Sequence, residues 1–164
     1  MKSTLIAVCI VLISTISAAS SFIWEGGETY CAYENGYACG DYILMWEAEV
    51  YSNLCPSDVL EEETDCDTDA NCTEYFVSYP CQTLLKDMMF AKTLVLPIGY
   101  ETKEFPFTKN NFPTVVDGTR YVVVVVAFER NPDGRENLSE FSNRMVVKLS
   151  DGVLVLKPMN IKIR

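Results

Sequence analysis

Residues Val115 to Phe128 read VVDGTRYVVVVVAF, and from Tyr121 on they are almost all β-branched or aromatic. Such side chains favour strands. We therefore predict a strand over Tyr121–Phe128. Because side chains alternate along a strand, this strand would present valines on both of its faces.

Strand-like runs recur on both sides of this segment. Strands are predicted for residues 42–51, 73–79 and 144–149, where apolar residues alternate with others. They are separated by stretches rich in Pro, Gly and Asn. Several short strands with such connections predict an all-β fold, specifically an antiparallel β-sandwich.

Two turns and one short helical stretch complete the predicted secondary structure. The composition of Asn131-Pro132-Asp133-Gly134 predicts a turn. A last run, Val153–Leu156, either closes a hairpin at Asp151-Gly152 or forms a tail. After the first residues of the chain no amphipathic helix is predicted, beyond one or two turns within Thr83–Leu96.

The segment that contains Tyr121 is similar to the E–F corner and F strand of a fibronectin type III domain. That family has the pattern Leu-x-Pro-Gly-Thr-x-Tyr, followed by alternating apolar residues and an Ala. Gly118, Thr119 and Tyr121 match it, whereas Val115 replaces Leu and Asp117 replaces Pro. The resemblance implies that the Tyr121 hydroxyl hydrogen-bonds to the chain just upstream.

The resemblance covers about residues 40–150. It implies that Trp46 is the core tryptophan of strand B, that residues 73–79 are strand C and that residues 144–149 are strand G. Two long insertions remain, at about residues 52–72 and 82–113. Loops of this length are commonly functional, and here we expect disulfides to pin them.

A narrower resemblance concerns Leu138-Ser139-Glu140-Phe141-Ser142, which is similar to the Trp-Ser-x-Trp-Ser box of class I cytokine receptors. Both Trp positions are changed, to Leu138 and Phe141. In that family, arginines of strand F stack between the tryptophans through cation–π contacts. The strand at Tyr121–Phe128 offers no arginine, so a generic type III loop is the alternative interpretation.

The first residues resemble a cleavable secretory signal. Lys2 precedes the apolar stretch Leu5–Ile16, and small residues follow it. We therefore predict a signal at residues 1–19, a type III-like domain at 20–150 and an extra strand or tail at 151–164. A single-span anchor is the alternative for the signal. The mature chain is expected to be secreted and to have no membrane span.

The cysteines agree with export to an oxidising compartment. Six of the seven lie beyond the predicted signal, an even number that predicts three disulfides of open pairing. A metal site is the competing idea, but the spacing contains no Cys-x-x-Cys. Asn71 and Asn137 begin glycosylation sequons. The six cysteines are Cys31, Cys39, Cys55, Cys66, Cys72 and Cys81.

Charge and composition exclude several functions. The formal net charge is −10, and residues 21–81 hold 14 Asp and Glu without any Lys or Arg. Such a chain lacks the basic patches that nucleic acids and anionic membranes require. It also has no His, which excludes Ser-His-Asp, Cys-His and His-metal chemistry. We expect no enzyme activity, no cofactor and no metal.

An acidic stretch within the cysteine-rich half has three interpretations. It is a solvated loop, a docking surface for a basic partner, or a calcium loop. The calcium loop is disfavoured, because Ala70 stands where an EF-hand needs Gly and Phe76 where it needs Glu. The acidic candidates for binding are Glu61, Glu62, Glu63, Asp65, Asp67 and Asp69.

Two further surfaces are candidates for binding. One is an apolar stripe on the outer face of the sheet formed by strands C, F and G, unless residues 82–112 cover it. The other is the loop at residues 129–140, with Asp133 and Arg135. The stripe consists of Phe76, Val122, Val124, Val126 and Val146, with Arg144 and Lys148 on either side of Val146.

These features predict a secreted module that binds an extracellular protein. The specific version is a soluble, receptor-like decoy for a basic cytokine or chemokine. One alternative is a protease inhibitor or toxin-type effector framed by the cysteines. Another is a passive component of the extracellular matrix.

Overall fold

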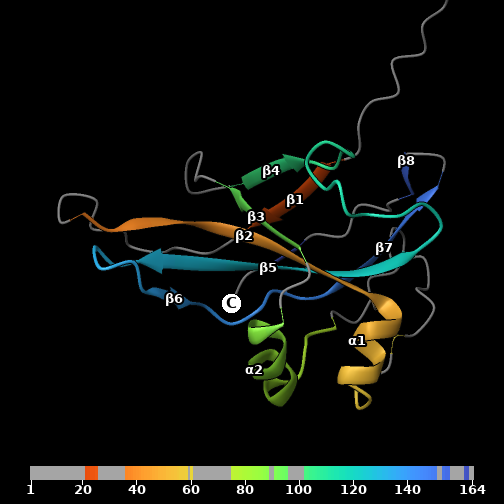
Figure 1. Cartoon of the computed structure of the whole chain (residues 1–164), viewed down its shortest axis with the longest axis horizontal. Coiled ribbons are helices and arrows are strands. Elements are labelled where there is room, and N and C mark those ends of the chain that lie inside the picture. The colour runs from red at the N-terminus through yellow and green to blue at the C-terminus, as the bar shows by residue number, and fades with distance from the viewer. Residues whose placement is uncertain are drawn as a thin grey trace, which may run out of the picture.

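A computed structural model shows how these segments are arranged (Figure 1). It describes residues 21–25, 36–58, 60, 75–88, 91–95, 102–150, 153–155 and 161–162. The predicted signal and the acidic stretch at 61–69 lie outside these ranges.

The centre of the fold is a six-stranded sheet built around β5 (Arg120–Arg130). β2 (Ala38–Glu47) pairs with β5 along its whole length, and β3 (Ala91–Val95) pairs with the other side of β2. The opposite edge of β5 pairs with β6 (Glu136–Leu138) and β7 (Met145–Ser150), and β8 (Val153–Val155) follows β7. All of these pairs are antiparallel.

A smaller sheet has three strands. In it, β1 (Ser21–Glu25) pairs antiparallel with β4 (Thr102–Pro106) and parallel with β9 (Ile161–Lys162). Side chains of both sheets meet in a first apolar core, which Trp24 of β1 shares with Met45 of β2. The Trp24 indole N–H also donates to the Asp41 carboxylate over 3.1 Å. The buried members are Phe22, Trp24, Ile43, Met45, Phe107, Phe112, Val115, Tyr121, Val123, Val125, Met145 and Val147.

Two helices cover the other face of the six-stranded sheet: α1 (Ala48–Leu54) and α2 (Tyr79–Asp87) (Figure 1). They pack on a second apolar core, to which β5 contributes the side chains that alternate with those of the first. Both faces of β5 are therefore buried, which explains its unbroken valine run. The second core contains Tyr42, Leu44, Trp46, Ala48, Tyr51, Cys55, Val77, Cys81, Leu85, Val122, Val124, Val126, Phe128 and Phe141.

Several predictions are confirmed. The described residues are mostly strands in antiparallel sheets. The strand predicted at 121–128 lies within β5, and the strand predicted at 144–149 coincides with β7 to within one residue at each end. Gly134 adopts a φ of 87°, and its N–H donates to the Asn131 carbonyl over 2.9 Å, which closes the predicted turn. Ser150 lies opposite Val153, so the last run pairs back as a hairpin strand.

The corner at Tyr121 also has the expected hydrogen bond. The Val116 N–H donates to the Tyr121 hydroxyl over 2.9 Å, and Gly118 adopts a φ of 80° in the turn between them. Trp46, however, lies in the second core and not in that of Tyr121. Trp24 is the tryptophan that shares the Tyr121 core, so the prediction for Trp46 is corrected.

The two helices correct the predicted strands. The strand predicted to Tyr51 ends at Glu47, and α1 follows it directly. Of the strand predicted over 73–79, the described residues from Tyr75 onward form one bridge, between Phe76 and Asn143, and α2 begins at Tyr79. Pro80 stands in the first turn of α2, where its fixed φ and missing N–H favour helix initiation.

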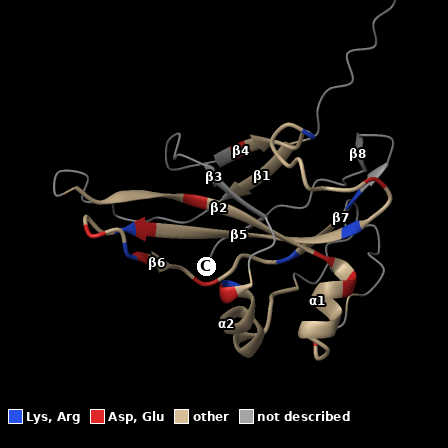
Figure 2. Ribbon diagram, viewed as in Figure 1, with Lys and Arg blue, Asp and Glu red and all other residues tan. Residues whose placement is uncertain are grey.

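The acidic segment at residues 21–81 and the basic residues that follow it lie on different elements. No Lys or Arg occurs between residues 3 and 85, so β1, β2 and α1 carry acidic residues but no basic ones. Arg120 and Arg130 lie at the ends of β5, and Lys148 lies in β7 (Figure 2).

Candidate functional site: the helical layer

The predicted apolar stripe is not an exposed surface. Val122, Val124 and Val126 are fully buried, and Val146 and Phe76 are partly buried. The prediction failed because α1 and α2 cover this face. Residues 82–112 were the segment expected to cover the stripe if it was buried. Of this segment, the part up to Asp87 belongs to α2, whereas β3 is a strand of the six-stranded sheet and β4 a strand of the three-stranded sheet.

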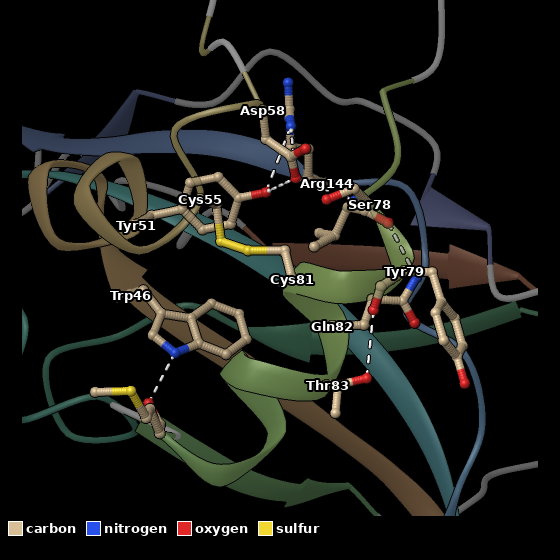
Figure 3. The surroundings of a disulfide bond; sticks show 12 residues. Trp46, Tyr51, Cys55, Asp58, Ser78, Tyr79, Cys81, Gln82, Thr83 and Arg144 are labelled. Carbon is tan, nitrogen blue, oxygen red and sulfur yellow. Dashed lines mark hydrogen bonds and ion pairs between the residues drawn. A yellow bond between two sulfur atoms is a disulfide. The ribbon is translucent and has the colours of Figure 1, made fainter.

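A disulfide joins the two helices. Cys55 follows the end of α1 and bonds to Cys81 in the first turn of α2, with Cα atoms 5.8 Å apart (Figure 3). This confirms a disulfide for one pair of the six cysteines that were predicted to form three. Cys39 is disulfide-bonded as well. Cys31, Cys66 and Cys72 lie outside the described residues.

α2 is anchored at both ends by side chains. At its start, the Gln82 amide donates to the Val77 carbonyl over 3.0 Å and accepts the Phe141 N–H over 3.2 Å. At its end, the Trp46 indole N–H donates to the Met88 carbonyl over 2.9 Å (Figure 3). These bonds hold α2 against the sheet in one orientation.

A buried ion pair connects the helical layer to the sheet. Arg144, just before β7, lies 3.7 Å from the Asp58 carboxylate, and both side chains are 7% exposed (Figure 3). The same Asp58 oxygen accepts the Tyr51 hydroxyl over 2.8 Å and the Ser78 N–H over 3.0 Å. The guanidinium also lies over the rings of Tyr51 and Tyr75, with 5.9 and 5.5 Å from its central carbon to the ring centres. A buried charge requires such compensation.

The surroundings of the ion pair shift the pKa values of Asp58 and Tyr51 in opposite directions. Burial raises the pKa of Asp58, but hydrogen bonds from Ser78 and Tyr51 and the charge of Arg144 more than offset it, so the pKa is lowered overall. Burial, helped by the bond to Asp58, raises the pKa of Tyr51 far above its ordinary value, against the opposing effect of Arg144. The pair therefore favours an ionised carboxylate beside a neutral phenol.

The cluster does not offer a ready metal site. Cys55, Asp58 and Cys81 bring potential ligand atoms together within 4.8 Å. Both sulfurs, however, are bonded to one another and so provide no thiolate. The carboxylate already accepts hydrogen bonds from two donors. The arrangement serves to fasten α1, α2 and the sheet together.

The outward face of α2 carries apolar side chains among the polar Thr83 and Asp87, which are also exposed. Leu84 and Met88 are 41% and 48% exposed, and Tyr79 at the start of the helix is 75% exposed. Pro80, Leu84 and Met88 follow one another at four-residue intervals, which places them on one side of the helix. We call Tyr79, Pro80, Leu84 and Met88 the α2 row. Sequence reasoning missed it, although Pro80 followed by this spacing was the available signal.

The other predicted site residues are scattered. Arg144 is buried in the ion pair, so its predicted place beside an exposed stripe was wrong, whereas Lys148 is exposed on β7. Asp133 and Arg135 are exposed in the loop between β5 and β6 and form an ion pair of 3.1 Å. Asn137 is exposed on β6. Asn71 and the acidic candidates from Glu61 to Asp69 lie outside the described residues.

Comparison of the chain with protein-family models, curated proteins and solved structures gives no match. No helix among the described residues combines the length and the apolar character needed to cross a bilayer. The function is therefore inferred from the arrangement of the helical layer and from the sequence.

Proposed function

We propose that this chain is a secreted binding module that recognises a basic extracellular protein through the α2 row. The framework is a fibronectin type III-like sandwich in which β2, instead of residues 73–79, corresponds to strand C, and β5 and β7 correspond to strands F and G. The Tyr121 corner and the first core between the two sheets support this assignment. Under it, the helical layer is an addition to the outer face of the C–F–G sheet.

The observation that carries the proposal is the exposure of the α2 row. A helix that packs on a sheet ordinarily buries its apolar side chains and leaves polar ones outside. α2 buries Gln82 beside Leu85, whereas Leu84 and, just past the end of the helix, Met88 face solvent together with the polar Thr83 and Asp87. Clustered aromatic and apolar side chains on a rigid element are typical of the centre of a protein interface. The disulfide and the bonds of Gln82 and Trp46 provide that rigidity.

Charge supports a basic partner. The chain has no Lys or Arg between Lys2 and Lys86, so β1, β2 and α1 form a negatively charged field. In the helical layer, Glu49 of α1 and Asp87 of α2 are exposed, whereas Lys86 of α2 is partly buried (Figure 2). Such a field speeds association with a basic protein and disfavours acidic ones. Export is supported by the signal-like first residues and the disulfides.

The test uses full-length protein secreted from a eukaryotic host with its disulfides intact. The immobilised protein is presented with purified basic cytokines and chemokines, and with acidic extracellular proteins of similar size. We expect saturable binding of at least one basic probe, weakened as salt rises from about 0.05 to 0.3 M because screening shortens the reach of the charges. Equal binding of acidic probes, or binding that salt does not weaken, would contradict the proposal.

Variants locate the surface. Leu84→Gln with Met88→Gln removes apolar contacts and leaves the net charge unchanged, so we expect Kd to rise by about tenfold or more. Val116→Gln is the matched control, because Val116 is 53% exposed and lies in the turn beside the first core, not on α2. Equal affinity of the double variant and the control would show that binding does not use the α2 row.

A further inference from the structure

The sequon at Asn137-Leu138-Ser139 lies on β6, in a position that the proposed binding surface does not use. Asn137 is exposed, whereas its neighbours Glu136 and Leu138 are partly buried. β6 pairs antiparallel with the end of β5, where Asn137 lies opposite Glu129. The acceptor amide therefore belongs to a short strand at the border of the sheet.

The pleat of β6 determines where the Asn137 side chain points. Glu136 accepts the Tyr42 hydroxyl over 2.6 Å, and Leu138 packs against the second core to which Tyr42 belongs. Both neighbours thus face the side of the sheet that α1 and α2 cover. Because successive side chains of a strand alternate, Asn137 faces the opposite side.

We propose that Asn137 carries an N-linked oligosaccharide on the sheet face that points away from the helical layer. In the transfer, Asn137 Nδ2 forms a bond to C1 of the sugar and loses one proton. The C1–oxygen bond of a lipid-linked oligosaccharide diphosphate breaks, and the lipid diphosphate leaves. The inference rests on the proposed function only in requiring entry into the secretory pathway, where such donors are found.

This placement has two consequences. The glycan adds bulk and solubility at β6, a three-residue strand at the sheet border, and so disfavours pairing with strands of other chains. It also leaves the α2 row open, because the row and the glycan lie on opposite sides of the sheet. Glycosylation and recognition are therefore compatible in one molecule.

The experiment is intact-mass and peptide mapping of the secreted full chain, before and after removal of N-glycans by a peptide amidase that converts the occupied Asn to Asp. We expect conversion at residue 137, loss of that glycan in Asn137→Gln, and its retention in Ser139→Thr, which keeps the hydroxyl. Asn131→Gln is the matched control, since Asn131-Pro132-Asp133 in the adjacent loop is not a sequon. An unmodified Asn137 in a secreted chain would overturn this inference and leave the proposed function standing.

A chain that stays in the cytosol without any glycan would instead overturn both proposals. A separate experiment tests on which face of the sheet the glycan lies. Met88 of the α2 row is 48% exposed, so its oxidation reports whether the glycan covers the row. We expect hydrogen peroxide to oxidise Met88 at the same rate in the glycosylated protein and in Asn137→Gln. Slower oxidation in the glycosylated protein would show that the glycan covers the α2 row and would overturn the face assignment.

Discussion

The Asp58 carboxylate lies 3.7 Å from the Arg144 guanidinium, and each side chain is only 7% exposed. Asp58 follows α1, and Arg144 directly precedes β7. This pair ties the helical layer to the sheet electrostatically, and the Cys55–Cys81 bond ties the two helices covalently. The orientation of the proposed binding surface depends on both.

Removing the cation of the ion pair and leaving its carboxylate should destabilise the folded protein. We expect Arg144→Met to lower the free energy of unfolding by about 3–5 kcal/mol, because it leaves the Asp58 charge buried without its cation. Asp58→Asn in the same chain should recover part of this loss, since no unpaired charge remains. Chemical denaturation of the single and double variants measures the coupling. Strict additivity of the two changes would show that the charges do not interact.

Acid should weaken the same contact. The folded-state pKa of Asp58 is below its ordinary value, so the carboxylate stabilises the fold above the unfolded pKa of about 3.9. That contribution is lost as pH falls through the folded-state pKa. We expect the denaturation midpoint to drop below about pH 4, and to drop less steeply in Asp58→Asn. The same pH profile in both proteins would assign the acid sensitivity to other carboxyl groups.

The Cys55–Cys81 bond should contribute to global stability. Its removal in Cys55→Ala with Cys81→Ala frees a loop with a sequence separation of 26, and we expect a loss of about 2–4 kcal/mol. Denaturant unfolding monitored by Trp fluorescence gives this value. An unchanged midpoint would mean that the noncovalent contacts of α2 suffice to hold the helices.

The corner hydrogen bond can be tested by removing one hydroxyl. Tyr121→Phe removes the acceptor for the Val116 N–H and should destabilise the protein by about 1 kcal/mol. Tyr79→Phe is the matched control, since its side chain is 75% exposed. Thermal unfolding should separate the two variants, and equal unfolding temperatures would show that the corner bond makes no net contribution.

A charge on the face of β5 that the helices cover should prevent folding and not merely binding. Val124 is fully buried beneath the helices, so Val124→Asp places a carboxylate in an apolar core at a cost of more than about 4 kcal/mol. We expect this variant to be poorly secreted, and Val116→Asp to be secreted normally. A folded Val124→Asp protein would show that the helical layer opens from the sheet.

Particular residues show how far the sequence alone could lead. The valine run predicted β5, and the composition of residues 131–134 predicted the turn at Gly134, because these preferences are local and need no partner. The prediction that Val122, Val124 and Val126 form an exposed stripe was wrong. Alternation states which side chains share a face, but it does not state what covers that face. The start of α2 was missed for a related reason, since Tyr75, Val77 and Tyr79 alternate like a strand, although α2 begins at Tyr79. The one or two helical turns predicted within Thr83–Leu96 overlap only the second half of α2, and Ala91–Val95 forms β3.

The sequence by itself determined the local conformations, the charge division and the even number of cysteines beyond the predicted signal, because each is a property of neighbouring residues or of composition. Only the tertiary structure decided that α1 and α2 cover the sheet, that Asp58 meets Arg144 and that Cys55 bonds to Cys81. Those contacts join residues far apart in the chain, and their free energy comes from removing apolar surface and charge from water together. No single segment carries that information, so the exposed α2 row emerged only once the layers were in place.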